Sequence, residues 1–128
     1  MAILESLKID GTINTPHINF DVENGVFEIG GKSMPEDAVD FYMPILDWVQ
    51  EFSIRPIKDA KFKIQLMYFN TASSKLILEI IKKIGNSSSN VSIDWYFYED
   101  DEDMEEVGEH LQSILGEDCV TLIPTEEE

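Results

Sequence analysis

Six stretches of the chain are predicted to be β-strands. In four of them, residues 4–9, 17–22, 61–69 and 91–98, hydrophobic residues recur at every second position, only loosely in the first, and a period of two is typical of β-strands that bury one face. In one of these stretches, Ile18, Phe20 and Val22 share one face of the predicted strand. The six predicted strands span residues 4–9, 17–22, 26–29, 61–69, 91–98 and 119–123. Asn24-Gly25 favours a tight hairpin turn between the second and third strands. Gly30-Gly31 is expected to end the third strand.

The fourth predicted strand, residues 61–69, shows the alternation over its whole length. Its apolar positions are Phe62, Ile64, Leu66 and Tyr68. All four side chains are expected to share the face that packs on the core, because alternate residues of a strand point to the same side.

Three other segments carry apolar residues three or four positions apart, a spacing that predicts amphipathic helices. The apolar faces consist of Ala38, Phe41, Tyr42, Ile45, Trp48, Val49 and Phe52; of Leu76, Ile77, Ile80, Ile81 and Ile84; and of Met104, Val107, Leu111 and Ile114. Ser33 and Glu36 form a capping-box pattern that predicts the start of the first helix, with Pro35 in its first turn. Pro44 falls inside this helix and predicts a kink.

The predicted elements follow the order β-β-β-α-β-α-β-α-β. A hairpin followed by alternating helices and strands predicts an α/β (α+β) fold with a mixed sheet and right-handed crossovers, the helices packing on the sheet. Neither a linker nor an internal repeat divides residues 1–128, so we expect a single domain. Residues 124–128 are expected to form a frayed acidic tail.

The chain has 128 residues with 9 basic and 26 acidic side chains, a net charge of 9 − 26 = −17. This charge argues against binding to nucleic acids and to anionic membranes, and favours a basic or amphipathic protein partner. The single cysteine, Cys119, indicates a reducing compartment. With neither a signal peptide nor an apolar run of roughly 20 residues, the protein is expected in the cytoplasm.

Signatures of catalysis and of cofactor binding are weak. Gly30-Gly31-Lys32-Ser33 fails as a phosphate-binding loop, because Val26 stands where the motif requires glycine. His17, His110 and Cys119 are far apart along the chain and make a poor metal set. The sequence therefore predicts neither a catalytic residue, nor a metal ion, nor a cofactor.

Residues 99–106 contain seven carboxylates in eight positions. The run lacks the central glycine of a calcium-binding loop. Carboxylates at a helix start interact favourably with the helix dipole, and they also attract a basic partner. The acidic run therefore has two interpretations, a solvated helix start and a surface that a partner recognises, and the two are compatible.

The segment YFNTASSK, residues 68–75, joins a predicted strand to a predicted helix and carries the hydroxyls of Thr71, Ser73 and Ser74. A helix N-terminus presents unpaired N–H donors and partial positive charge, so it tolerates a phosphate. Simple capping by Asn70 or Thr71 explains the same residues without any modification.

Four segments together resemble the SiaC family of bacterial regulatory phosphoproteins, formerly a domain of unknown function. They are GKSMPED (31–37), FYMPILDW (41–48), YFNTASSK (68–75) and WYFYEDDEDM (95–104). The resemblance implies a STAS-like fold without catalytic activity. It also implies three partners: a dedicated Ser/Thr kinase, a PP2C-like phosphatase, and a diguanylate cyclase that the unphosphorylated form binds and activates in cyclic-di-GMP and biofilm control.

By position, the resemblance assigns phosphorylation to Thr71, with Ser73 and Ser74 as weaker alternatives. The partner-binding candidates are Tyr68, Phe69, Asn70, Ser73, Ser74, Lys75, Ser33 and Glu36. Three alternatives remain: an anti-sigma factor antagonist that switches partners with an anti-sigma kinase, a small enzyme that uses clustered carboxylates, and an acidic structural protein.

Overall fold

The computed structural model describes residues 4–55, 57, 59–87 and 90–126. Its elements are β1 (Leu7–Ile9), β2 (His17–Asp21), β3 (Val26–Ser33), α1 (Ala38–Ile54), β4 (Lys61–Phe69), α2 (Thr71–Gly85), β5 (Ser92–Tyr98), α3 (Glu102–Leu115) and β6 (Val120–Thr125). This order confirms the predicted α/β fold with a mixed sheet.

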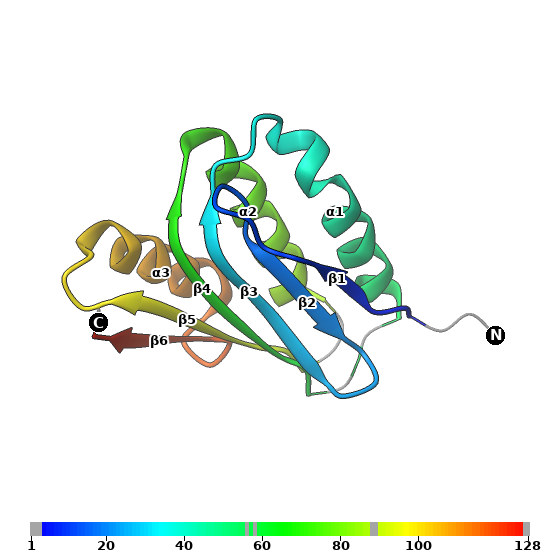
Figure 1. The fold of residues 1–128 in the computed structure, drawn as a ribbon. Helices are drawn as coiled ribbons and strands as arrows, with labels where there is room; N and C mark the ends of the chain where they lie inside the picture. The colour runs from blue at the N-terminus through cyan, green and yellow to red at the C-terminus, as the bar shows by residue number, and fades with distance from the viewer. Residues whose placement is uncertain (1–3, 56, 58, 88–89, 127–128) are drawn as a thin grey trace.

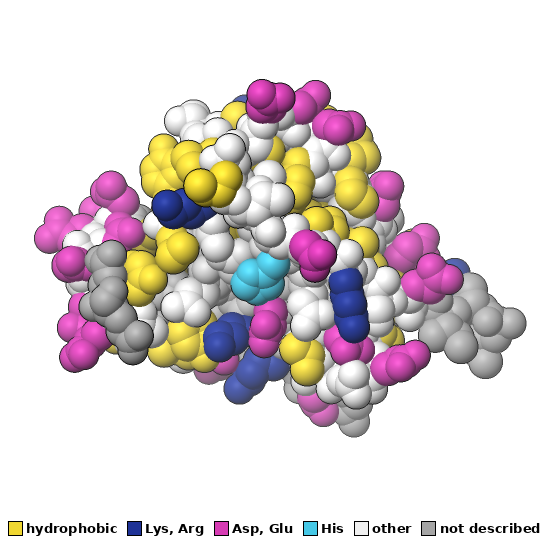
Figure 2. Space-filling view, in the orientation of Figure 1, with side chains coloured by type: hydrophobic (Ala, Val, Ile, Leu, Met, Phe, Trp, Pro, Cys, Tyr) yellow, Lys and Arg dark blue, Asp and Glu magenta, His cyan; other side chains and the backbone are white. Residues whose placement is uncertain are grey.

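The six strands form one sheet in the order β1-β2-β3-β4-β5-β6. The β1–β2 and β2–β3 pairs are antiparallel, and the other three pairs are parallel. Each crossover from β3 onward moves to the next strand in the same direction. Because such crossovers are right-handed, all three helices pack on one face of the sheet (Figure 1). The other face carries no described helix, and Figure 2 shows charged and polar side chains spread across it.

The core lies between the helices and the inward face of the sheet. Its strand residues alternate as predicted and include Ile18, Phe20, Phe27, Ile29, Phe62, Ile64, Leu66, Ile93, Trp95, Phe97 and Val120. An aromatic cluster fills the side near β1 and β2, with ring centroids 4.5 Å apart for Phe20 and Trp48 and 4.8 Å apart for Phe27 and Phe62. Rings at these separations add stabilisation to the burial of their apolar area.

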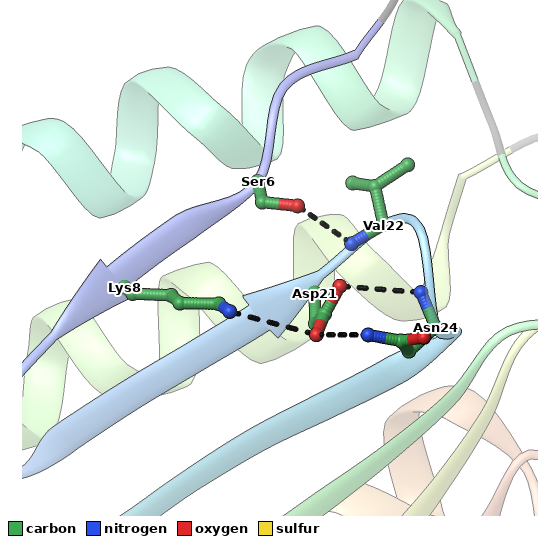
Figure 3. A network of polar contacts seen from close by, with 5 residues as sticks. All are labelled: Ser6, Lys8, Asp21, Val22 and Asn24. Atoms are coloured by element: carbon green, nitrogen blue, oxygen red, sulfur yellow. Dashed lines mark hydrogen bonds and ion pairs between the residues drawn. The ribbon is translucent and has the colours of Figure 1, made fainter.

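The β2–β3 hairpin has a longer loop than predicted. Asp21 pairs with Val26, so four residues, 22–25, close the turn instead of the three predicted, 23–25. The Asp21 carboxylate accepts hydrogen bonds from the backbone N–H and the side-chain amide of Asn24, at 3.2 Å and 2.8 Å (Figure 3). These bonds, and the nearby ammonium group of Lys8, hold the pKa of Asp21 below its ordinary value. The Ser6 hydroxyl, just before β1, accepts a hydrogen bond from the N–H of Val22 and so links the start of β1 to the same turn.

The first helix begins later than the capping box predicts. Asp37 is the N-cap of α1, and its side chain accepts a hydrogen bond from the N–H of Asp40 at 3.0 Å. Met34 precedes a proline, which disfavours helical backbone at that residue, and its N–H donates to the carbonyl of Asn14 at 2.7 Å. The assignment of Ser33 and Glu36 as a capping box is therefore wrong. The helix runs through Pro44 as one element, from Ala38 to Ile54.

The third strand does not end at Gly30-Gly31, because β3 continues to Ser33. Its pairing with β4 shifts at this point: Gly31 pairs with Leu66, and Lys32 pairs with Tyr68. Met67 is thus an extra residue, which makes a β-bulge. Gly31 has a φ of 109°, a conformation that side chains rarely adopt.

The bulge changes the direction of the side chains after it. Tyr68, predicted to face the core, is 50% exposed, whereas Phe69 packs partly buried against the core. Bulges re-aim side chains in this way, and they are common beside functional sites.

The last strand also extends further than predicted. β6 includes Pro124 and Thr125, which pair with Phe97 and Tyr98 of β5. The expected frayed tail is therefore wrong for these two residues, and residues 127–128 lie outside the described part of the chain.

Candidate functional site

The candidate site lies where β4 and β5 separate. These strands pair only from Lys61 with Ser92 to Ile64 with Trp95. Beyond that point β4 stays with β3 and β5 stays with β6. The carboxyl ends of β4 and β5, where α2 and α3 begin, therefore diverge. The sheet order still places the start of the segment of residues 68–75 across a groove from the acidic run, because the two follow neighbouring strands.

A groove of about 280 Å³ occupies this divergence. Its lining residues are Met67, Tyr68 and Phe69 from β4, and Asp101, Asp103, Met104 and Val107 from the start of α3. The side chain of Met67 is 42% exposed. The groove continues into a second hollow of about 660 Å³, which Lys32, Tyr98 and the carboxylates of residues 100–103 line. The groove therefore has an apolar floor bordered by carboxylates. Figure 2 shows acidic side chains gathered around the start of α3.

Thr71 is the first residue of α2, and it is exposed. Asn70 is the N-cap: its side-chain oxygen accepts from the N–H of Ser73 at 2.9 Å. The N–H of Asn70 donates to the carbonyl of Ser33 at 3.0 Å, which fixes this helix start to the end of β3. The first turn of α2 contains no acidic residue, so no carboxylate of that turn offsets the positive end of the helix dipole.

Three hydroxyls form a buried cluster beneath Thr71. The Ser33 hydroxyl donates to the Ser73 hydroxyl at 2.9 Å and lies 2.5 Å from that of Tyr42. Ser33 and Ser73 are both fully buried, at 0% exposed. Burial raises the pKa of Tyr42 to about 12, an effect that the hydrogen bonds of Ser33 and Ser73 partly oppose. The cluster links β3, α1 and α2 with mutually satisfied polar groups.

The other predicted site residues lie at different depths. Ser74 is half-buried, and its hydroxyl donates to the carbonyl of Thr71 at 2.8 Å. Lys75 is exposed one turn further along α2. Glu36 is exposed in the connection between β3 and α1. The structure therefore brings together Ser33 and Ser73, and places Tyr68 and Phe69 in the groove.

Sequence reasoning missed Tyr42 and Met67 as parts of this site. Tyr42 was assigned to an apolar stripe, although its hydroxyl requires a partner when buried. That requirement is the available signal, and it points to another polar group in the core. Met67 carries no such signal, because a bulge depends on the pairing of two strands.

The acidic run forms the start of α3, as one of the two interpretations expects. Asp101 is the N-cap and accepts from the N–H of Met104 at 3.1 Å, while Glu102, Asp103 and Glu105 lie in the first turn. Among the residues that the structure describes, no cluster of His, Cys, Asp and Glu could hold a metal ion. Burial raises the pKa of the Cys119 thiol, which disfavours the reactive thiolate. No helix in the described part of the chain could span a membrane.

Fold and site together define a class: a two-layer α/β domain with one open sheet face, whose distinctive surface is an exposed hydroxyl beside an acidic groove. A family model described as SiaC family regulatory phosphoprotein matches residues 9–124. The chain belongs to this family.

Solved structures agree with that assignment. The protein is similar to SiaC of Pseudomonas aeruginosa in a complex described as the diguanylate cyclase SiaD with its activator SiaC, with a TM-score of 0.77 and 26% identity over 93% of this chain and 99% of the other. Apo-SiaC from the same organism gives a TM-score of 0.72 at 27% identity over 94% and 98%. An uncharacterised protein of P. aeruginosa strain UCBPP-PA14 is 29% identical over 119 residues, 91% of each chain.

Proposed function

We propose that this protein is a non-catalytic signalling protein that reversible phosphorylation of Thr71 switches, and that its unphosphorylated form binds and activates a diguanylate cyclase. The observation that carries the proposal is the position of Thr71, exposed at the start of a helix whose first turn holds no carboxylate. The cyclase is proposed as partner because the similar SiaC is described as the activator of SiaD.

Exposure favours Thr71 over the two serines. A kinase must bring the reacting hydroxyl into its own active site, and the hydroxyl of Ser73 is buried in the cluster with Ser33. Ser74 is half-buried and its hydroxyl donates to the backbone. Thr71 requires no rearrangement of α2 to become accessible.

A phosphate on Thr71 would act through charge and desolvation. It adds almost two negative charges and three acceptor oxygens to a surface that a partner must cover. If the phosphate lowers the partner's affinity by about 2–3 kcal/mol, binding falls by roughly 30- to 150-fold. An effect of this size switches a signalling partner without a large conformational change. A Ser/Thr kinase and a PP2C-like phosphatase would set the phosphorylation state.

The test of the site is phosphorylation by the cognate kinase with ATP, followed by intact mass. One phosphate adds about 80 Da, and we expect the wild-type protein and Ser74→Ala to gain it. Thr71→Ala should gain none. If Thr71→Ala gains the same mass at the same rate, Thr71 is not the site.

The test of the partner is the activity of the source organism's SiaD-type diguanylate cyclase. We expect cyclic-di-GMP synthesis to rise when unphosphorylated protein is added, and to remain at the basal rate with the Thr71-phosphorylated protein. Equal activation by both forms would disprove the switch, and no binding to the cyclase would disprove the partner.

A further inference from the structure

Helix α2 differs in charge from the helices on either side of it. It carries Lys75, Lys82 and Lys83 against Glu79 alone, a net charge of 3 − 1 = +2, although the whole chain is at −17. Neighbouring α1 holds three acidic residues and no Lys or Arg, and α3 holds five acidic residues and no Lys or Arg. Packing contacts join α2 to both α1 and α3, so its outer face is a basic stripe between two acidic helices.

The basic stripe on α2 also contains a groove. A shallow groove of about 350 Å³ is lined by Lys75, Leu78, Glu79, Lys82, Lys83 and Asn86. Lys83 lies 3.9 Å from Glu79 and is partly neutralised by it. Lys75 and Lys82 form no ion pair with any residue that the structure describes. Leu78 lies between them along the helix and is half-buried.

The stripe begins at the proposed phosphorylation site. Thr71 and Lys75 are four residues apart on α2, and residues at this spacing are neighbours on a helix surface. A phosphate on Thr71 would thus lie beside Lys75 and bring the net charge of the helix close to zero.

The sign of this change identifies the partner's chemistry. A basic partner at this surface would bind more tightly after phosphorylation, because the phosphate adds attraction. An acidic partner would lose the attraction of Lys75 and meet a repelling charge. Only the acidic partner fits a switch whose unphosphorylated form binds.

We infer that the α2 stripe, defined by Lys75, Leu78 and Lys82, is the docking surface for an acidic segment of the cyclase that carries an apolar side chain to cover Leu78. This inference rests on the proposed function. The net charge of the chain predicts a basic partner. The α2 stripe is basic, so the inference instead predicts that the contacting segment of the partner is acidic.

The experiment compares the affinity of the source organism's SiaD-type cyclase for three forms of the full chain, by isothermal titration calorimetry. They are the wild type, Lys75→Glu/Lys82→Glu, and the control Lys61→Glu/Lys63→Glu. Lys61 and Lys63 are exposed on the strand β4. Both double substitutions change the net charge by −4, at different places on the surface. The control also removes the ion pair of Lys61 with Asp94 and the contact of Lys63 with the Tyr96 ring, so it is the more disruptive substitution of the two. Circular dichroism of each variant, and the neutral pair Lys75→Gln/Lys82→Gln, separate loss of binding from loss of folding.

We expect the α2 reversal to lower the affinity at least about tenfold, the neutral pair to lower it less, and the β4 control to change it by no more than about twofold. Raising the salt concentration should weaken the wild type more than the α2 variant. If the folded α2 variant binds as the control does, while phosphorylation still abolishes binding, the docking surface is wrong and the proposed function stands. If the wild type does not bind the cyclase, both the docking surface and the cyclase as partner are wrong, whereas phosphorylation of Thr71 is judged by the intact-mass experiment.

Discussion

Two consecutive strand-to-helix junctions, β4–α2 and β5–α3, share a design and differ in charge. In each, a polar N-cap accepts a hydrogen bond from the backbone N–H three residues later: Asn70 from Ser73 at 2.9 Å, and Asp101 from Met104 at 3.1 Å. The first turn of α3 adds three carboxylates, whereas that of α2 adds none. The positive end of the α3 dipole is already offset, while that of α2 is available to an anion.

The difference explains why one junction suits a phosphate and the other does not. A phosphate at the start of α3 would join a dense group of carboxylates and be repelled. At Thr71 it would meet a positive helix end and Lys75. Two neighbouring junctions of one sheet therefore differ in what they can accept: the β5–α3 junction provides an acidic groove wall, and the β4–α2 junction has an electrostatic environment that suits an added anion.

The largest expected effect comes from placing a charge beneath the β4–α2 junction. Ser73→Asp would bury a carboxylate against Ser33 and Tyr42, and we expect it to lower the free energy of unfolding by at least about 3 kcal/mol. Urea denaturation measures the loss. Ser74→Asp, at a half-buried position, is the control and should cost much less. If Ser73→Asp and Ser74→Asp lower the free energy of unfolding equally, burial in the hydroxyl cluster does not make position 73 more sensitive to charge than position 74.

A second effect tests the same cluster through pH. Because the pKa of Tyr42 rises from 10.0 to about 12 on folding, the folded protein holds this proton more tightly. The resulting stability is fully present below pH 10 and is lost as the pH rises toward 12. We expect a loss on the order of 2–3 kcal/mol in the wild type beyond that of Tyr42→Phe. Parallel stability curves for the two proteins would contradict the burial of this phenol.

The caps provide a smaller and more direct comparison. Asn70→Ala and Asp101→Ala should each lower the free energy of unfolding by about 1 kcal/mol, because each leaves a backbone N–H without its partner. Exchanging the cap types should be asymmetric. Asn70→Asp should stabilise α2 by about 0.3–1 kcal/mol, whereas Asp101→Asn should change little because three other carboxylates remain. Equal and opposite effects, measured by urea denaturation, would mean that the two helix ends are electrostatically alike.

The smallest expected effect comes from the substitution that imitates the proposed phosphorylation most directly. Thr71→Asp should raise the free energy of unfolding by about 0.3–1 kcal/mol at low salt, and less at high salt, through the dipole of α2 and Lys75. Thr71→Asn, similar in shape and uncharged, is the control. Thermal unfolding at two salt concentrations measures the difference. A destabilised Thr71→Asp would indicate that the helix end is less receptive to an anion than its first turn suggests.

Periodicity was sufficient to predict the architecture of this protein. The alternation of Ile18 and Phe20, and of Ile93 and Trp95, survives in the structure because one face of the sheet is buried along its whole width. The start of α2 was also predictable, since Asn70 is a strong local capping signal. Local signals and tertiary packing agree at these positions.

The local signals failed where pairing between strands decides the structure. The bulge at Met67 reverses the expected direction of Tyr68, and it depends on the register between β3 and β4, which are far apart in sequence. Ser33 has the local pattern of a helix cap, but the pairing of β3 with β4 and the hydroxyls of Tyr42 and Ser73 hold it at the end of a strand. That packing also buries Ser73. The difference in exposure between Ser73 and Thr71 therefore could not be predicted from local sequence.

The two borders of the sheet also affect how the protein meets other chains. β1 is only three residues long, and β6 contains Pro124, which has no N–H to offer. Short strands and prolines at a sheet border discourage another strand from adding to it. Aggregation by strand addition is therefore disfavoured at both ends, even though each outermost strand has only one neighbour.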